Sequence, residues 1–104
     1  MNIGTAIKSV RTQLGFSQEE LSRKTGLSQT SISQIENGIK SPSKKSINKI
    51  CQTLEVPEAV LYIIGIDNSD IPASRKEMFN DLYPQIKELA IQIIGKRKSK
   101  FISN

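Results

Sequence analysis

Residues 17–38, which read SQEELSRKTGLSQTSISQIENG, decide the fold. Ser17, followed three residues later by Glu20, is the pattern of a capping box at the start of a helix. Gly26 suits the left-handed backbone that follows a helix end, and Ser28 can cap a second helix over 29–37, which Gly38 closes. Two short helices joined by so tight a turn must cross steeply. The stretch therefore predicts a helix-turn-helix.

The second of these helices has one apolar side and one polar side. Ile32 and Ile35 can pack inward together. The opposite side carries amides and hydroxyls without net charge, at Gln29, Thr30, Ser33, Gln34 and Asn37. A Gln side chain can pair with adenine in the major groove, and a Thr methyl group can contact the thymine methyl. An ordinary solvated surface would have the same composition, so this helix alone leaves both interpretations open.

Helical periodicity continues on both sides of the stretch, and signals for strands are nearly absent. Ile3, Ile7, Val10 and Leu14 form a first apolar stripe, and Ile47, Ile50, Cys51 and Leu54 form another. Ser43 can cap the helix that carries this later stripe, and Pro57 suits the first turn of a fifth helix. The sequence predicts an all-α fold, with a five-helix domain over residues 1–66.

A C-terminal helical segment is expected over 75–95, after a polar linker at 67–74 and before a basic tail at 96–104. Its apolar residues follow a heptad-like spacing: Phe79, Leu82, Ile86, Leu89 and Ile93. Pro84 lies inside this pattern and is expected to kink or split the helix. We expect the stripe to form a dimer interface, because five helices can close a core without it. The alternative is that it folds back as a sixth core helix.

The segment at 16–56 closely resembles the phage repressor/Cro-like (XRE) helix-turn-helix family, and the resemblance extends over roughly residues 5–65. The residues in register are Gln18, Leu21, Gly26, Ser28, Ile32, the IENG at 35–38, Pro42 and the LEV at 54–56. The chain departs from the family at Ser22, where alanine is usual. A serine fits there if its hydroxyl group bonds to a carbonyl group.

The resemblance implies a five-helix repressor-like fold and a set of DNA contacts. Base edges would be contacted by Gln29, Thr30, Ser33 and Gln34. Gln18, Asn37 and Lys40 would contact phosphates. Lys44 and Lys45 are further candidates for phosphate contacts, because they lie shortly after the recognition helix. Arg11 and Glu36 match a partly buried ion pair found in some relatives. Members of the family usually bind palindromic operators as two-fold dimers.

Composition limits the remaining functions. The chain has 104 residues and a net charge of +5, which favours a polyanionic partner such as nucleic acid. It has no histidine and one cysteine, so a disulfide within the chain and a zinc site of His/Cys type are excluded. We predict Cys51 to be a core residue. No nucleophile–base set is evident, so we expect no catalytic residues, no cofactor, no metal site and no enzyme activity. Without a signal-peptide core or a run of about 20 apolar residues, we expect a cytoplasmic protein with no membrane partner.

The sequence thus predicts a homodimeric transcriptional regulator that binds double-stranded DNA and acts as a repressor. The alternative is an antitoxin-like or other interaction subunit whose C-terminal segment binds an unidentified protein partner. RNA is the less favoured nucleic acid, because aromatic residues make up 5% of the chain and stacking platforms are scarce.

Overall fold

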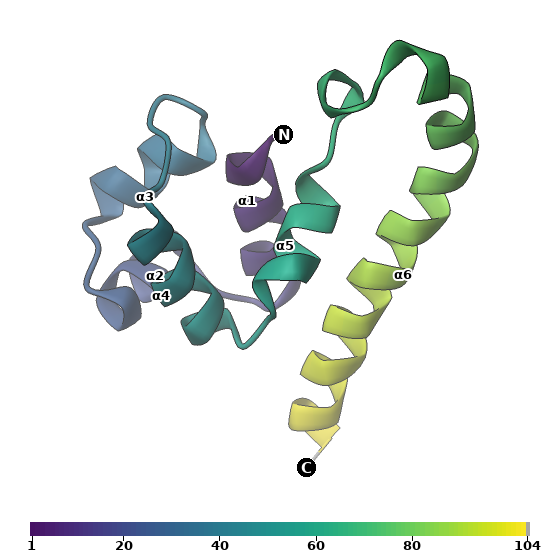
Figure 1. Cartoon of the computed structure of the whole chain (residues 1–104). Helices are drawn as coiled ribbons and strands as arrows, with labels where there is room; N and C mark the ends of the chain where they lie inside the picture. Colours follow the sequence, from purple (N-terminus) through teal and green to yellow (C-terminus); the bar gives the residue numbers. More distant parts are fainter. Residues whose placement is uncertain (104) are drawn as a thin grey trace.

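The computed structural model describes the backbone of residues 1–103 and the side chains of residues 1–95. All regular structure in this part of the chain is helical (Figure 1). The α-helices are α1 (Ile3–Gln13), α2 (Gln18–Thr25), α3 (Gln29–Glu36), α4 (Lys44–Leu54), α5 (Glu58–Gly65) and α6 (Lys76–Ser103). Two 3-10 turns, η1 (Asn68–Asp70) and η2 (Ala73–Arg75), occupy the expected linker. The all-α prediction is confirmed.

The helix caps and the helix-ending glycine predicted from the sequence occur at the expected residues. The Glu20 N–H donates to Ser17 Oγ at 3.0 Å and the Ser17 N–H donates to the Glu20 carboxylate at 3.2 Å, which completes the capping box of α2. Gly26 has a φ of 79°, in the left-handed region. Ser28 caps α3 through the Ser31 N–H at 3.0 Å. Pro57 differs slightly from expectation, because it is the cap of α5 and not its first helical residue.

An aliphatic core lies between α1 and the other helices. Ile7, Leu21, Ile32, Ile50 and Leu61, one from each of α1 to α5, have at most 1% of their surface exposed. Cys51 is buried among them, as its position in the α4 stripe predicted.

The start of α1 lies against the end of α3 at van der Waals distance. A Cβ atom added to Gly4 would lie 2.1 Å from the carbonyl oxygen of Ile35, which no real side chain tolerates. Glycine at position 4 therefore sets how closely α1 approaches α3.

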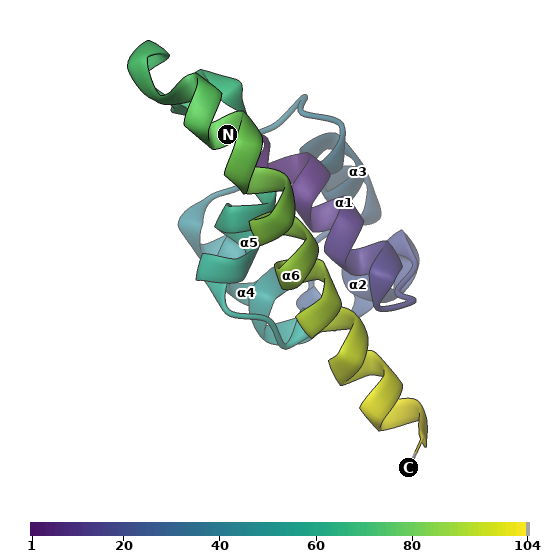
Figure 2. The same cartoon turned by 90° about the vertical axis from the view of Figure 1, so that its right-hand side faces the viewer.

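Helix α6 folds back across α5 and α1 (Figure 2). Ala90 and Ile94 are buried in the same core as the first five helices. The hydroxyl group of Tyr83 donates to the carbonyl oxygens of Ile63 at 2.6 Å and Ile64 at 3.0 Å. Burial raises the pKa of this phenol above its ordinary value, so it remains a donor. Our expectation that 1–66 closes the core alone is therefore wrong, since α6 supplies part of it.

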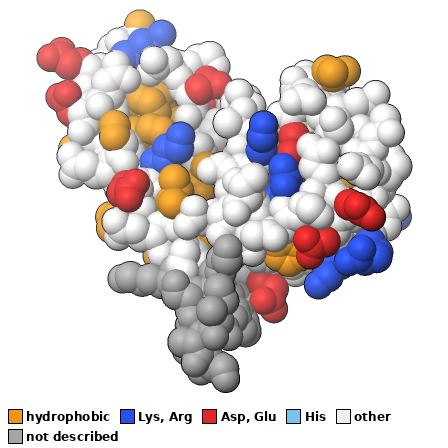
Figure 3. Space-filling view, turned by 180° about the vertical axis from the view of Figure 1, so that it is seen from behind, with side chains coloured by type: hydrophobic (Ala, Val, Ile, Leu, Met, Phe, Trp, Pro, Cys, Tyr) orange, Lys and Arg blue, Asp and Glu red, His pale blue; other side chains and the backbone are white. Residues whose placement is uncertain are grey.

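The predicted apolar stripe lies beside this inner face and is largely uncovered. Leu82 and Ile86 are each 50% exposed, Leu89 is 59% exposed and Ile93 is 64% exposed. Phe79 differs, because it is half-buried and stacks on Tyr83 with 4.6 Å between ring centroids. Figure 3 shows hydrophobic side chains gathered on the lobe that contains the linker and the start of α6. The segment thus packs on its own domain and still presents an apolar surface.

Pro84 was expected to kink or split α6, and the split is wrong, because the helix runs through this position. A proline in a helix interior removes one backbone hydrogen bond and costs about 3 kcal/mol. Tertiary contacts hold the helix on both sides of this position, through the Tyr83 hydroxyl before it and the buried Ala90 and Ile94 after it. The expected basic tail at 96–104 falls on residues whose side chains lie outside the described part. No helix among the described residues is both long enough and apolar enough to cross a bilayer.

Candidate nucleic-acid interface

The turn between α2 and α3 is held by side-chain hydrogen bonds. The Thr25 hydroxyl group donates to the Leu21 carbonyl at 2.6 Å and accepts the Leu27 N–H at 3.2 Å. Ser22, the residue that departs from the family pattern, donates to the Leu27 carbonyl at 2.6 Å. Its hydroxyl group is therefore satisfied, and it ties the end of the turn back to α2.

This turn leaves the polar side of α3 open to solvent. Ile32 and Ile35 are buried at 1% and 2% exposure, while Gln29 and Thr30 are exposed. A shallow hollow of about 320 Å³ is lined by Gln18, Gln29, Thr30, Ser33 and Gln34. The structure thus brings the four predicted base-contacting residues together with Gln18 on one surface. Their amide and hydroxyl groups can donate and accept hydrogen bonds, as readout of base edges requires.

A buried ion pair lies behind this surface and joins three helices. Arg11 Nε donates to Glu36 Oε2 at 2.7 Å, and Arg11 Nη2 donates to Glu36 Oε1 at 3.0 Å. The two side chains are only 9% and 1% exposed. The remaining bonds are donated by Arg11 Nη1 to the Phe16 carbonyl at 2.7 Å and by Gln18 Nε2 to Glu36 Oε1 at 3.0 Å. Both charges are thus satisfied, as burial requires.

The residues predicted to contact phosphate are spread around the hollow on α3. Asn37 caps α3, and Lys40 follows it in the loop, with its Nζ 3.1 Å from Ser31 Oγ. Lys44 and Lys45 are exposed in the first turn of α4. The structure places Gln18 differently from the other four, because its amide nitrogen is engaged with the buried Glu36.

Two features of this region were missed by sequence reasoning. The bond from Gln18 to Glu36 joins a predicted DNA contact to the ion pair, and no sequence spacing signals it. Ile39 is 74% exposed in the loop between Gly38 and Lys40. The exposure of Ile39 could have been predicted, because an isoleucine directly after a helix-ending glycine lies outside the apolar pattern of either neighbouring helix.

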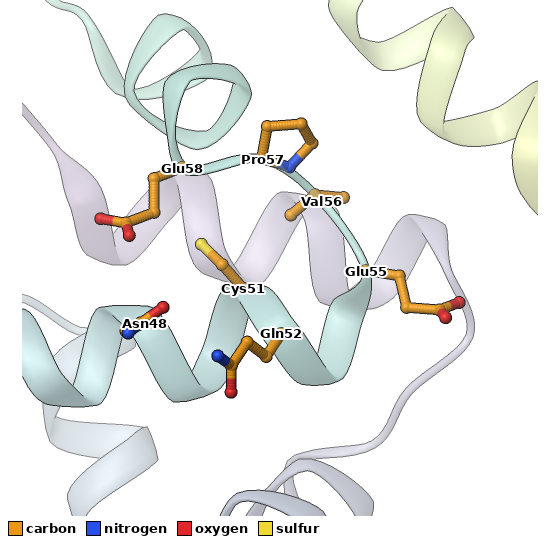
Figure 4. Close-up of a pocket in the computed structure, with 7 residues that line it drawn as sticks. All are labelled: Asn48, Cys51, Gln52, Glu55, Val56, Pro57 and Glu58. Atoms are coloured by element: carbon orange, nitrogen blue, oxygen red, sulfur yellow. The ribbon is translucent and has the colours of Figure 1, made fainter.

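A second hollow, of about 430 Å³, lies where α4 meets α5 (Figure 4). Its lining residues are Asn48, Cys51, Gln52, Glu55, Val56, Pro57 and Glu58. Burial, assisted by the charge of Glu58, raises the pKa of the Cys51 thiol to about 11. The thiol is therefore protonated at neutral pH and is a poor nucleophile. No group of three or more His, Cys, Asp or Glu residues within the described part is placed to hold a metal ion.

Comparison with known proteins agrees with this geometry. A family model described as helix-turn-helix matches residues 7–61. Antitoxin PezA of Streptococcus pneumoniae is 33% identical over 101 residues, which are 97% of this chain and 57% of the relative. Antitoxin HipB of Escherichia coli is 41% identical over 54 residues, 52% of this chain and 57% of the relative. An uncharacterized HTH-type transcriptional regulator of Mycobacterium tuberculosis is 34% identical over 60 residues, 58% of this chain and 43% of the relative. This chain spans about half the length of the curated relatives it matches.

Proposed function

Because this chain belongs to the helix-turn-helix family of repressor/Cro-like (XRE-type) DNA-binding proteins, we propose that it is a repressor that reads its operator with α3. The observation that carries the proposal is the uncharged, hydrogen-bonding surface on α3, open to solvent and backed by a satisfied ion pair. A helix inserted in the major groove needs such groups, and it needs a rigid support behind them.

The position of Lys44 and Lys45 supports phosphate binding beside that groove. Both lie in the first turn of α4, which holds no acidic residue. Positive charges at a helix N-terminus oppose the helix dipole, at a cost of about 0.3–1 kcal/mol each. Two exposed lysines at this position therefore destabilise the helix slightly. A phosphate group nearby would offset this unfavourable interaction, and its attraction to both lysines would contribute to DNA binding. We propose that Lys40 and Asn37 contact the same backbone.

We propose that the protein binds a palindromic operator as a dimer formed through α6. The exposed stripe on α6 supports this, since one recognition helix reads only a few base pairs. In Figure 1, α3 and α6 lie at opposite edges of the molecule, so pairing through α6 leaves α3 uncovered.

Operator selection followed by variant binding tests the proposal. Sites are selected from random duplex DNA, and the affinities of Gln29→Ala and Gln34→Ala for the selected site and for random DNA are compared by gel shift. Each variant should lose about 1–3 kcal/mol on the selected site and relax the preference at one base pair. Lys45→Ala is the matched control, because it should weaken binding to every sequence and flatten the salt dependence by about one unit. Equal losses of a Gln variant on both DNAs would contradict base readout.

An antitoxin-like role is the second candidate, and it has a specific observation behind it. Two of the relatives are named antitoxins, and one of them matches 97% of this chain. In this role, the apolar stripe on α6 would bind a protein partner. Light scattering of the purified chain separates the two candidates, because the repressor dimer needs no second protein and the antitoxin-like role predicts an unpaired monomer.

A further inference from the structure

A groove at the start of α6 runs into the exposed stripe and forms one apolar surface with it. The groove has a volume of about 510 Å³ and lies between the end of α5, the linker and the first turns of α6. Met78, Leu82 and Ile86 belong both to its wall and to the row of exposed side chains. Leu89 and Ile93 continue this row beyond the groove. Such a long contiguous apolar surface is rare on a monomer unless it binds something.

The polarity of α6 shows which side of the helix is left for a partner. Tyr83, Ala90 and Ile94 face the core. The side of α6 that points away from the core is polar and exposed, and it carries Asp81, Gln85, Glu88 and Gln92. The stripe is therefore a third face, bounded by the core on one side and by polar residues on the other.

The stripe is almost symmetric about its central residue. Phe79 and Ile93 lie seven positions before and after Ile86, while Leu82 and Leu89 lie four before and three after it. A two-fold axis that passes beside Ile86 and runs perpendicular to the helix would place each residue opposite an apolar residue of a second copy. The most common protein interface is a self-complementary patch of this kind.

We propose that a second copy of this chain covers the surface, with the two α6 helices antiparallel and crossing at Ile86. This register rests on the proposed α6 dimer and specifies its geometry. Leu89 and Ile93 of one copy then lie over the groove of the other. The paired stripe from Phe79 to Ile93 is about 21 Å long, at about 1.5 Å per residue.

Charge and cavity both favour the antiparallel arrangement over the parallel one. Arg75 is the one charged residue that lines the groove among the described residues. Parallel pairing would bring the Arg75 guanidinium groups of both copies together beside two unfilled grooves. Antiparallel pairing separates these charges by more than the length of the stripe, fills both grooves with apolar side chains and opposes the two helix dipoles.

Disulfide trapping tests this register, because a residue on a two-fold axis meets its own copy. The native chain has one cysteine, the buried Cys51, and serves as the background. Ile86→Cys should form a disulfide-linked dimer on mild oxidation, seen on a non-reducing gel. Leu82→Cys and Leu89→Cys should each cross-link at least several-fold less when alone, and should cross-link with each other when mixed. Gln92→Cys, on the polar flank, is the matched control and should remain monomeric on the gel.

The alternative outcomes overturn the proposal in distinguishable ways. Equal self-cross-linking by all three stripe variants would indicate parallel helices. A monomer in light scattering with no cross-link from Ile86→Cys would assign the stripe to a different occupant. Gln29→Ala should cross-link normally when it is combined with Ile86→Cys. Failure of DNA readout and failure of this pairing are therefore separate results.

Discussion

Replacing Glu36 with alanine should be among the most destabilising single changes available in this chain. The change removes the acceptor of three hydrogen bonds, two from Arg11 at 2.7 and 3.0 Å and one from Gln18 at 3.0 Å. It also leaves the Arg11 guanidinium without its counter-ion in a residue that is 7% exposed. Breaking a buried pair by removing one partner costs about 3–5 kcal/mol, because the remaining charge cannot recover its hydration.

That cost is a large share of the stability of a small domain, which is about 5–15 kcal/mol. For a domain near this size, each kcal/mol lowers the melting temperature by about 4 °C or more, so the expected loss is at least about 12 °C. Thermal and urea unfolding followed by far-ultraviolet circular dichroism measure it. Because a buried pair is weakly screened, the loss should change little between low and high salt.

Two further variants show whether the loss comes from the unpaired charge. Replacing both residues, with Arg11→Met and Glu36→Met together, should cost clearly less than the sum of the single changes, since no charge is left unpaired. Glu88→Ala removes an exposed carboxylate from α6 and should change stability by about 0.5 kcal/mol or less. A Glu36→Ala protein within about 1 kcal/mol of the native chain would refute the reasoning, as would a double variant that loses the full sum.

Three other predictions follow from single contacts. Gly4→Ala should destabilise the fold by about 1–3 kcal/mol, because its Cβ would clash with the Ile35 carbonyl oxygen. Gly95→Ala should instead stabilise α6 by about 0.5–1 kcal/mol, because its Cβ meets only the flexible end of a side chain. Urea unfolding of both variants tests the contrast. Cys51, with a pKa of about 11, should be about one-thousandth thiolate at pH 8, so iodoacetamide should label it at least tenfold faster in denaturant, and fast labelling of the native chain would contradict its burial. Tyr83→Phe should cost about 1 kcal/mol in thermal unfolding through the lost hydroxyl bonds, and an unchanged melting temperature would show that they do not hold α6.

The helix boundaries were predictable because local chemistry sets them. Ser17, Ser28 and Ser43 each accept an N–H from the first turn that follows, and Gly26 takes the left-handed conformation at the turn. These interactions lie within a few residues of each other in the chain, so sequence spacing carries nearly all the information. The four α3 residues that line the hollow, Gln29, Thr30, Ser33 and Gln34, were predictable because helical spacing places them on the side opposite Ile32 and Ile35.

The role of α6 was only half predictable, because two apolar faces on one helix compete in the sequence pattern. The stripe through Leu82, Ile86 and Leu89 has the heptad-like spacing, but Tyr83 and Ala90 lie one residue later, about 100° around the helix. Periodicity shows that both faces exist and does not show which one meets the core. Packing decided it, since the Tyr83 hydroxyl group reaches backbone carbonyls at the end of α5 and the small Ala90 allows a close approach.

Helix α1 contacts both α3 and α6. Gly4 allows the start of α1 to pack closely against the end of α3, and Arg11 of α1 forms an ion pair with Glu36 of α3. The stripe on α6 faces away from these contacts, so a partner on α6 changes neither the ion pair nor the hollow on α3 directly. Under the proposed α6 dimer, a change at Leu89 should therefore alter how many copies bind DNA together, whereas a change at Gly4 or Glu36 should alter how firmly each copy holds α3.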